Sequence, residues 1–395
     1  MIFNEPSYFF LFLLPCVSLF HLTRGEWRGW VLAVFGGAFF VYYGNLHFGG
    51  FWGSICVGII VWELLFSRLY RKGSWTCIAG IIQAILLLVV FKYSHFFVSL
   101  WQDLAPGARI SQPNFLAGLF LPLGLSFFTF EFIHFAVDTY QGKIERAPAS
   151  HYAAFIFFFP SMVAGPLKRY QGFHEKLEKA SFEPAIFVRG ITRILVGLFK
   201  KHVLADTFTL WSDQLATSAA LHSPAISLVG WIFAYGMKIY FDFSGYSDVA
   251  IGSGYLLGIQ LPENFDWPYL SKNVSEFWRR WHISLSQWIR DYIYVPLGGS
   301  RKGEVSASVN LMIAFGVSGL WHGANYNFVA WGLWHGLLMV IHRAWRTYSP
   351  RMGIRLPAAA AIALTFISVN IGWGLFCVDI ARARIVFARI FTQLL

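Results

Sequence analysis

Long apolar runs recur along the whole chain, and this pattern limits the fold more than any other feature of the sequence. Only 13% of the 395 residues are charged, whereas soluble globular proteins carry about 25% charged residues. Several runs approach the roughly 20 residues that cross a bilayer, where backbone groups must pair within a helix. We therefore predict an all-α polytopic integral membrane protein, a single domain (1–395) of about ten to twelve transmembrane and re-entrant helices. The runs lie near residues 8–22, 30–43, 51–66, 78–100, 115–137, 152–166, 186–205, 225–241, 246–260, 305–320, 324–342 and 357–378.

The basic residues predict how the first segments are oriented. They cluster in alternate short loops, which the positive-inside tendency assigns to the cytoplasm, whereas the intervening segments 44–50 and 101–114 hold few. This arrangement places the N-terminus outside, with run 8–22 as a first transmembrane helix and not a removed signal peptide. We expect the net charge of +11 to face membrane lipid head groups, with no nucleic-acid partner. The clusters are Arg24 and Arg28; Arg68, Arg71 and Lys72; and Lys143 and Arg146.

The four cysteines, Cys16, Cys56, Cys77 and Cys377, lie far apart, each in or beside an apolar run. They form no CxxC pair, so we expect buried small hydrophobic side chains and neither disulfides nor a cysteine metal site. The sequence predicts no bound metal.

Polar residues concentrate in 240–302 and 318–342. Ionisable groups at membrane depth are costly, so such a concentration marks a functional site. The first 120 residues are predicted to be scaffold helices, residues 121–376 the core that holds this site and residues 377–395 a C-terminal tail.

The stretch 271–303 contains the densest group of basic and aromatic residues. Read as one helix, it places a polar stripe on one face, since the polar residues recur every three or four positions. One interpretation is an amphipathic anchor whose arginines meet lipid phosphates. The other is that Arg279, Arg280 and His282 face a phosphate-bearing substrate in a cavity, with Arg301 and Lys302 in the following turn as weaker phosphate contacts. The stripe comprises Ser275, Arg279, His282, Ser286 and Arg290.

Two carboxylates, Asp242 and Asp248, lie among aromatic residues in KIYFDFSGYSDVAIG (238–252). The motif FSGYS between them is typical of a break between helices. Either these carboxylates are buried and satisfied by backbone N–H groups or arginine, or one of them takes part directly in chemistry.

The segment FFFPSMVAGPLKRY (157–170) ends an apolar run with Pro, Gly and a Lys168–Arg169 pair. Proline and glycine end or kink a helix here. The basic pair predicts a membrane interface, and a structural role is favoured.

The pentapeptide GLWHG occurs twice in 319–336 and supplies His322 and His335. On a continuous helix, thirteen residues separate the two rings by about 220° at roughly 100° per residue, so a shared metal or substrate is not expected. His322 follows small residues and precedes Asn325, whereas His335 is enclosed by apolar neighbours, which favours a packing role. A neutral imidazole can accept a proton from a hydroxyl near neutral pH.

Taken together, the motifs resemble those of the membrane-bound O-acyltransferase family, within it the bacterial alginate O-acetyltransferase-like branch. The resemblance extends over about residues 120–376 and is weaker before them. The most specific combination is FWRRWHISLS with WIRDY, followed by LWHG. The resembling segments are LPLGLSFFTFE (121–131), FPSMVAGPLKRY (159–170), YFDFSGYSDVAIG (240–252), ENFDWPYLSKNVSEFWRRWHISLSQWIRDYIYVPLGG (263–299) and GLWHGANYNFVAWGLWHG (319–336).

This resemblance implies a curved ring of membrane helices around a central tunnel, in the bacterial cytoplasmic membrane. It implies that no cofactor is bound and that acetyl-CoA enters as the acyl donor from the cytoplasm. The acceptor is then a hydroxyl of an extracytoplasmic relay protein or an exported polysaccharide. The family's two functional histidines fall on His282 and His322, with His322 as general base, whereas no role falls on His335. Weaker contacts to the donor or tunnel are Arg279, Arg280, Trp281, Trp321, Asn325, Asp242, Arg301 and Lys302.

Two departures from the branch concern the polysaccharide and the partner more than the core reaction. Cys377 follows GWGLF (372–376) where those enzymes typically have an arginine, and the sequence ends at Leu395 where many continue. Transfer of a D-alanyl or fatty acyl group on the same fold stays open, as does a polytopic transporter or flippase. No internal symmetry of the transporter kind is found.

Overall fold

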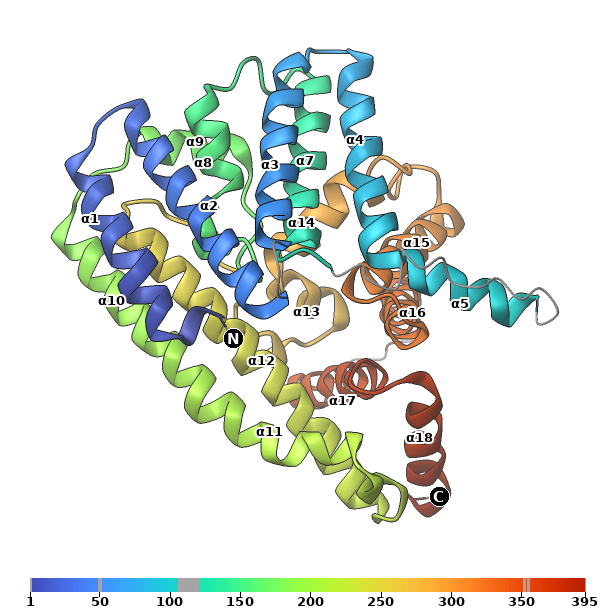
Figure 1. Cartoon of the computed structure of the whole chain (residues 1–395). Helices are drawn as coiled ribbons and strands as arrows, with labels where there is room; N and C mark the ends of the chain where they lie inside the picture. The colour runs from blue at the N-terminus through green and yellow to red at the C-terminus, as the bar shows by residue number, and fades with distance from the viewer. Residues whose placement is uncertain (1, 49–51, 106–120, 351–352, 354–355, 395) are drawn as a thin grey trace. The chain divides into compact units, whose positions relative to one another are not determined.

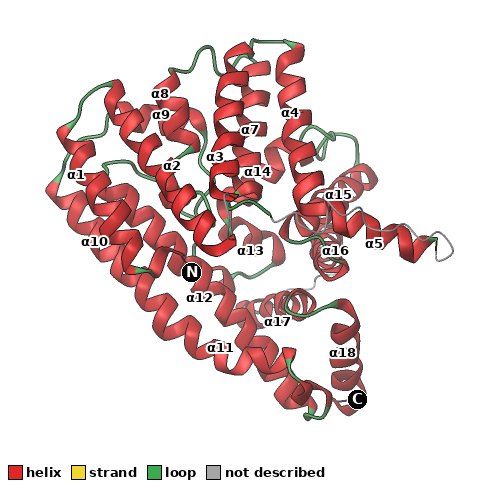
Figure 2. Cartoon of the chain, viewed as in Figure 1, coloured by secondary structure: helices red, strands yellow, loops and turns green. Residues whose placement is uncertain are grey.

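The computed structural model describes all residues except 1, 49–51, 106–120, 351–352, 354–355 and 395. Within these described ranges the chain is helical (Figure 2). The only β-type pairing in the same ranges is an isolated antiparallel bridge between Phe265 and Trp281. Five of the described helices are long and apolar enough to cross a membrane, which confirms an all-α polytopic membrane protein. They are Glu26–Leu46, Trp52–Leu69, Trp75–Leu104, Glu304–His322 and Ala358–Phe376.

Residues near the N-terminus form a shorter apolar helix, Tyr8–Leu22. That this helix crosses the bilayer, and that the N-terminus lies outside the cell membrane, stay predictions. The sparsely charged segments 44–50 and 101–114 lie partly outside the described residues.

The chain divides into two compact units, and the division falls inside the long helix α12 (Ala225–Leu256). Unit 1 comprises Met1–Gly197 and Tyr246–Pro262, and unit 2 comprises Leu198–Gly245 and Glu263–Leu395. These ranges differ from the expected scaffold, core and tail, because each unit combines segments distant in the sequence.

Unit 1 contains nine labelled α-helices besides its part of α12, counted over the described residues. Helix α2 packs against α3 and α8, and α4 packs against α7 (Figure 1). Gly36 permits the close approach of α2 to the end of α8, since a Cβ there would lie 1.9 Å from the carbonyl oxygen of Phe157. The helices are α1 (Leu14–Leu22), α2 (Glu26–Phe48), α3 (Trp52–Phe66), α4 (Trp75–Leu88), α5 (Ser94–Leu104), α7 (Leu125–Tyr140), α8 (Ala149–Ile156), α9 (Tyr170–Glu178) and α10 (Pro184–Phe199), with a π-helical turn Tyr8–Leu13 before α1.

The segment after α8 breaks the helix as its Pro and Gly residues predict, but its lysine is not at an interface. Lys168 is only 4% exposed and pairs with the buried carboxylate of Glu131 on α7. Its ammonium also lies 4.7 Å from the ring centroid of Phe155. The interfacial position predicted for Lys168 is therefore wrong, because a buried carboxylate and aromatic rings replace the head groups.

The basic loops of unit 1 lie beside one another. Arg68, Arg71 and Arg146 line one cavity of about 640 Å³, and the Gly73 N–H donates to the Tyr140 carbonyl oxygen at 2.9 Å. This proximity agrees with the prediction that both loops lie on one side of the membrane.

Unit 2 packs α15 (Glu304–His322) against α16 (Tyr326–Tyr348), and α16 against α17 (Ala358–Phe376). The first glycines of the two GLWHG copies lie in the α15–α16 contact. A Cβ on Gly319 would lie 2.2 Å from the Phe328 carbonyl oxygen, and one on Gly332 would lie 2.3 Å from that of Phe315. The glycine that begins each copy of the repeat therefore allows α15 and α16 to pack closely. The other helices are α11 (Asp206–Ser212), α13 (Val274–Arg280), α14 (Ile283–Ile289) and α18 (Ile380–Leu394).

Two helix predictions are wrong. The expected break at FSGYS is absent, since α12 continues through it from Ala225 to Leu256. The stretch 271–303 is not one helix but α13, α14 and a π-helical turn at Arg290–Tyr294, so its polar stripe is interrupted. The interruption lies at His282, whose φ of 44° is left-handed.

The cysteines fit their predicted packing role. Cys16, Cys56 and Cys77 are buried and Cys377 is partly buried, and all four are free thiols.

Candidate active site

His322 is the last residue of α15, and α16 begins only four residues later at Tyr326. The chain between them is a short turn, so the two GLWHG histidines lie on different helices and not on one continuous helix. The His322 ring centroid is 4.9 Å from those of Trp321 and Trp331 and 5.3 Å from that of Phe376. Residues of α15, α16 and α17 thus surround a partly exposed imidazole.

His335 lies in a different environment, although its ring also contacts Trp331, with the two ring centroids 5.0 Å apart. It is fully buried among the rings of Phe277, Trp278 and Phe315. Neither ring nitrogen has a hydrogen-bond partner. The angular separation predicted for a continuous helix is therefore wrong, but the apolar enclosure expected for His335 is confirmed.

His282 is held between α13 and α14 by Asn264, which lies 18 residues earlier. The Asn264 side-chain oxygen accepts from the Ser284 hydroxyl at 2.9 Å and lies 3.1 Å from the Nδ1 atom of His282. Because that oxygen is the acceptor, Nδ1 carries the hydrogen and Nε2 carries the lone pair. Burial, with His322 as a second cause, lowers the pKa of His282, which lies outside the five apolar helices, so the neutral ring is favoured.

The backbone around His282 explains its unusual conformation. The Ile283 N–H donates to the Asn264 carbonyl oxygen at 3.0 Å, and the Asp266 N–H donates to the Arg280 carbonyl oxygen at 3.0 Å. These bonds on both sides hold residue 282 at φ 44°. A strained, non-glycine residue fixed in this way is frequent at functional sites.

The structure brings His282 and His322 into one aromatic cluster within unit 2. The ring centroids of His282 and Trp321 lie 6.5 Å apart, and those of Trp321 and His322 lie 4.9 Å apart. Trp281 is also buried, and its ring centroid lies 4.9 Å from that of Trp373. An imidazole in such a cluster can pass a proton between an oxygen acid and a thiolate.

A cavity of about 450 Å³ adjoins this cluster in sequence and structure. Arg279 and Arg290 bring positive charge to its lining, and Ile283 and Ser318 place it next to His282 and one helical turn from His322. The cavity can hold a chain with an anionic end. The remaining lining residues are Ser275, Trp278, Leu285, Ser286, Gln287, Ile289, Tyr294, Leu311, Ala314, Phe315 and Met339.

The other predicted contacts are separated from this cavity. Arg280 pairs with Glu276 at 2.8 Å, and Asp242 pairs with Lys201 at 2.9 Å. Arg301, Lys302 and Asn325 are exposed and do not line the cavity.

Asp248 belongs to unit 1. It pairs with Arg193 at 2.5 Å, which confirms the structural alternative for that carboxylate.

Sequence reasoning missed Asn264 and Trp331. Asn264 stands in the recognised segment ENFDWPY, but only the fold shows that its side chain reaches residue 282. Trp331 has a buried indole N–H without a hydrogen-bond partner, next to His322. A buried donor without a partner costs free energy unless a ligand meets it.

We expect Asn264→Leu to lower kcat by about 10- to 100-fold, because a ring displaced by 1 Å loses reaction geometry. Asn264→Asp keeps the acceptor oxygen and should restore most of the activity. The measurement is acyl transfer by purified protein at saturating and limiting donor. An equal loss in both variants, or a change confined to KM, would contradict a positioning role for Asn264.

Comparison with known proteins identifies the family of this chain. The sequence profile of MBOAT, the membrane-bound O-acyltransferase family, matches residues 71–380. A probable alginate O-acetylase, AlgI, from Pseudomonas aeruginosa is 35% identical over 390 residues, covering 95% of this chain and 72% of that protein. A peptidoglycan O-acetyltransferase from Helicobacter pylori is 33% identical, covering 84% and 69%. A teichoic acid D-alanyltransferase from Bacillus subtilis is 26% identical, covering 82% and 89%. With most of its length matched in this way, the chain belongs to the membrane-bound O-acyltransferase family.

Proposed function

We propose that this membrane O-acyltransferase moves acetyl groups from acetyl-CoA, at the cytoplasmic face of a bacterial inner membrane, to a hydroxyl outside. The acceptor is a relay protein or an exported polysaccharide. The meeting of His282, at the break between α13 and α14, with His322, at the end of α15, in one aromatic cluster carries this proposal. Similarity to enzymes named for O-acetylation of alginate and peptidoglycan supports acetyl as the acyl group.

In the proposed reaction, His322 accepts the proton of the acceptor hydroxyl as its oxygen attacks the thioester carbonyl. The tetrahedral intermediate then collapses and the carbon–sulfur bond breaks. The leaving thiolate takes from His322 the proton that came from the acceptor hydroxyl. The unpartnered indole N–H of Trp331 is a candidate donor to the oxyanion, in addition to the exposed Asn325. His282, with its Nε2 lone pair, assists in proton transfer or orients the thioester.

The cavity lined by Arg279 and Arg290 is our candidate for the phosphate-bearing end of the donor. Guanidinium groups bind phosphate with two parallel hydrogen bonds. Arg301 and Lys302 stay weaker candidates, since they do not line this cavity.

We expect Arg279→Gln to raise KM for acetyl-CoA about tenfold with little change in kcat, since a charged hydrogen bond contributes about 1.5–3 kcal/mol. Arg280→Gln is the matched comparison, because Arg280 already pairs with Glu276 and does not line the cavity. Initial rates against donor concentration separate the two variants. Equal KM values for Arg279→Gln and wild type would place the donor phosphates elsewhere.

The reaction itself is tested by base-labile acetate on envelope and exported glycans, compared between deletion and complemented strains. Loss of acetate on deletion supports acetyl transfer. A second candidate is D-alanyl transfer, which the similarity to the teichoic acid D-alanyltransferase favours. Normal acetate together with lost D-alanine esters would replace our proposal with that one. Family membership removes the transporter or flippase that the sequence left open.

A further inference from the structure

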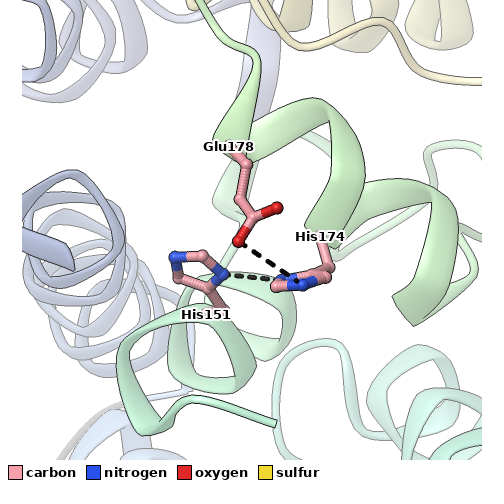
Figure 3. Close-up of side chains that lie close together, drawn as sticks. All are labelled: His151, His174 and Glu178. Carbon is pink, nitrogen blue, oxygen red and sulfur yellow. Dashed lines mark hydrogen bonds and ion pairs between the residues drawn. The ribbon is translucent and has the colours of Figure 1, made fainter. Parts of the chain in front are cut away.

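Two histidines and a glutamate converge between α8 and α9, in unit 1, with His151 buried and Glu178 exposed. His151 comes from α8, and His174 and Glu178 come from one face of α9 at i and i+4 (Figure 3). One donor atom of each residue lies within 4.8 Å of those of the other two. None of the three belongs to the histidine cluster of unit 2.

The distances fit a site that closes around an ion. The two Nδ1 atoms of His151 and His174 lie 2.6 Å apart, which requires one of them to donate a shared hydrogen to the other. Nε2 of His174 lies 3.6 Å from a Glu178 carboxylate oxygen. Ligand atoms around a tetrahedral zinc lie about 3.3 Å apart, because each bond measures about 2.0–2.2 Å. A small rotation of either ring brings the two Nδ1 atoms to that separation. The Glu178 carboxylate, which now lies beside the other nitrogen of His174, reaches the same ion through a change of side-chain rotamer, which its 57% exposure leaves room for.

We propose that His151, His174 and Glu178 bind one divalent transition-metal ion of the zinc class and thereby join α8 to α9. Two imidazoles and one carboxylate are a donor set that zinc accepts, with water in the fourth position. The site is open enough for entry, since the side chains of His174 and Glu178 are 30% and 57% exposed. This inference does not rest on the proposed acetyl transfer.

The surroundings hold the ligands in place. The Tyr170 ring stacks on the His174 ring at 5.6 Å, and the Tyr170 N–H donates to Nε2 of His134 at 2.9 Å, which fixes the start of α9. The Ser150 hydroxyl, next to His151 in the sequence, donates to Glu26 of α2 at 3.4 Å, which ties the start of α8 to α2.

The sequence does not predict this site, because His151 and His174 are 23 residues apart along the chain. Only His174 and Glu178 show a metal-like spacing, and one such pair is common on helix surfaces. A second pair of this kind, His202 and Asp206, has its closest atoms at 3.5 Å and provides a matched control.

The test uses the full chain, purified in detergent without a polyhistidine tag, stripped with chelator and dialysed against trace zinc. We expect about one zinc per chain by mass spectrometry. We also expect visible absorption typical of tetrahedral cobalt when Co²⁺ replaces zinc. Zinc should raise the unfolding temperature of this protein.

Two variants and one control decide the matter. His174→Gln and the more exposed Glu178→Gln should each weaken zinc binding at least tenfold, measured by competition with a chelating dye, whereas His202→Gln should not. The unfolding temperature of the metal-free variants checks their fold. If the wild-type protein binds no stoichiometric zinc, the proposal is overturned, and His151 and His174 form only a hydrogen-bonded pair. Zinc binding that both variants retain unchanged would overturn it too.

Discussion

Replacing His322 with alanine is expected to lower acyl transfer by about 10²- to 10⁴-fold, the usual contribution of a positioned general base. The partly exposed ring lies at the end of α15, where α16 and α17 also contribute neighbours, so its loss removes little buried structure. The measurement is base-labile acetate transferred per molecule of enzyme, in membranes with matched protein abundance.

His335→Ala is the matched control, because the same pentapeptide carries it and Trp331 also contacts its ring. This substitution empties a fully buried position and should cost about 2–4 kcal/mol of stability, as other large-to-small core changes do. The surviving molecules should keep their rate. Normal acetate with His322→Ala, in a strain where deletion abolishes it, would refute His322 as the base. Equal loss per molecule in both variants would contradict the assignment of separate roles.

Lys168→Met is expected to destabilise the protein by about 3–5 kcal/mol, because it leaves the buried Glu131 carboxylate without its counter-charge. The lysine also loses its contact with the Phe155 ring. Thermal unfolding and yield in detergent measure the effect.

The double variant Lys168→Met with Glu131→Gln should recover most of the lost stability, since replacing both partners removes the unpaired charge. Lys179→Met provides the surface comparison, because Lys179 pairs with Glu175 in full solvent, and it should change nothing measurable. A single Lys168 variant as stable as wild type would show that the ion pair is not a stability determinant. Failure of the double variant to recover would instead implicate packing of the lysine stem.

The sequence predicted the features that depend on local composition. Apolar runs of sufficient length identified the membrane-crossing helices, and Pro and Gly in 157–170 correctly ended α8. The contrast between His322 and His335 also followed from their immediate neighbours, since burial of a ring among apolar residues is visible in a short window.

Features that depend on distant partners were not predictable. Asn264 fixes the ring of His282 and allows a left-handed residue where a helical stripe was expected. Glu131 draws Lys168 into the interior from 37 residues away. Helix α12 continues through FSGYS because a single glycine among good packing residues weakens a helix by only about 1 kcal/mol, which tertiary contacts offset.

The crossing of α15 and α16 at Gly319 and Gly332 has a consequence for protein engineering. No side chain of any size fits there, since even a methyl group would meet the opposite backbone. The placement of His322 is therefore not adjustable by mutations at the crossing. Attempts to change how the donor is bound should begin with the lining of the neighbouring cavity, where Leu311 and Met339 offer volume to exchange.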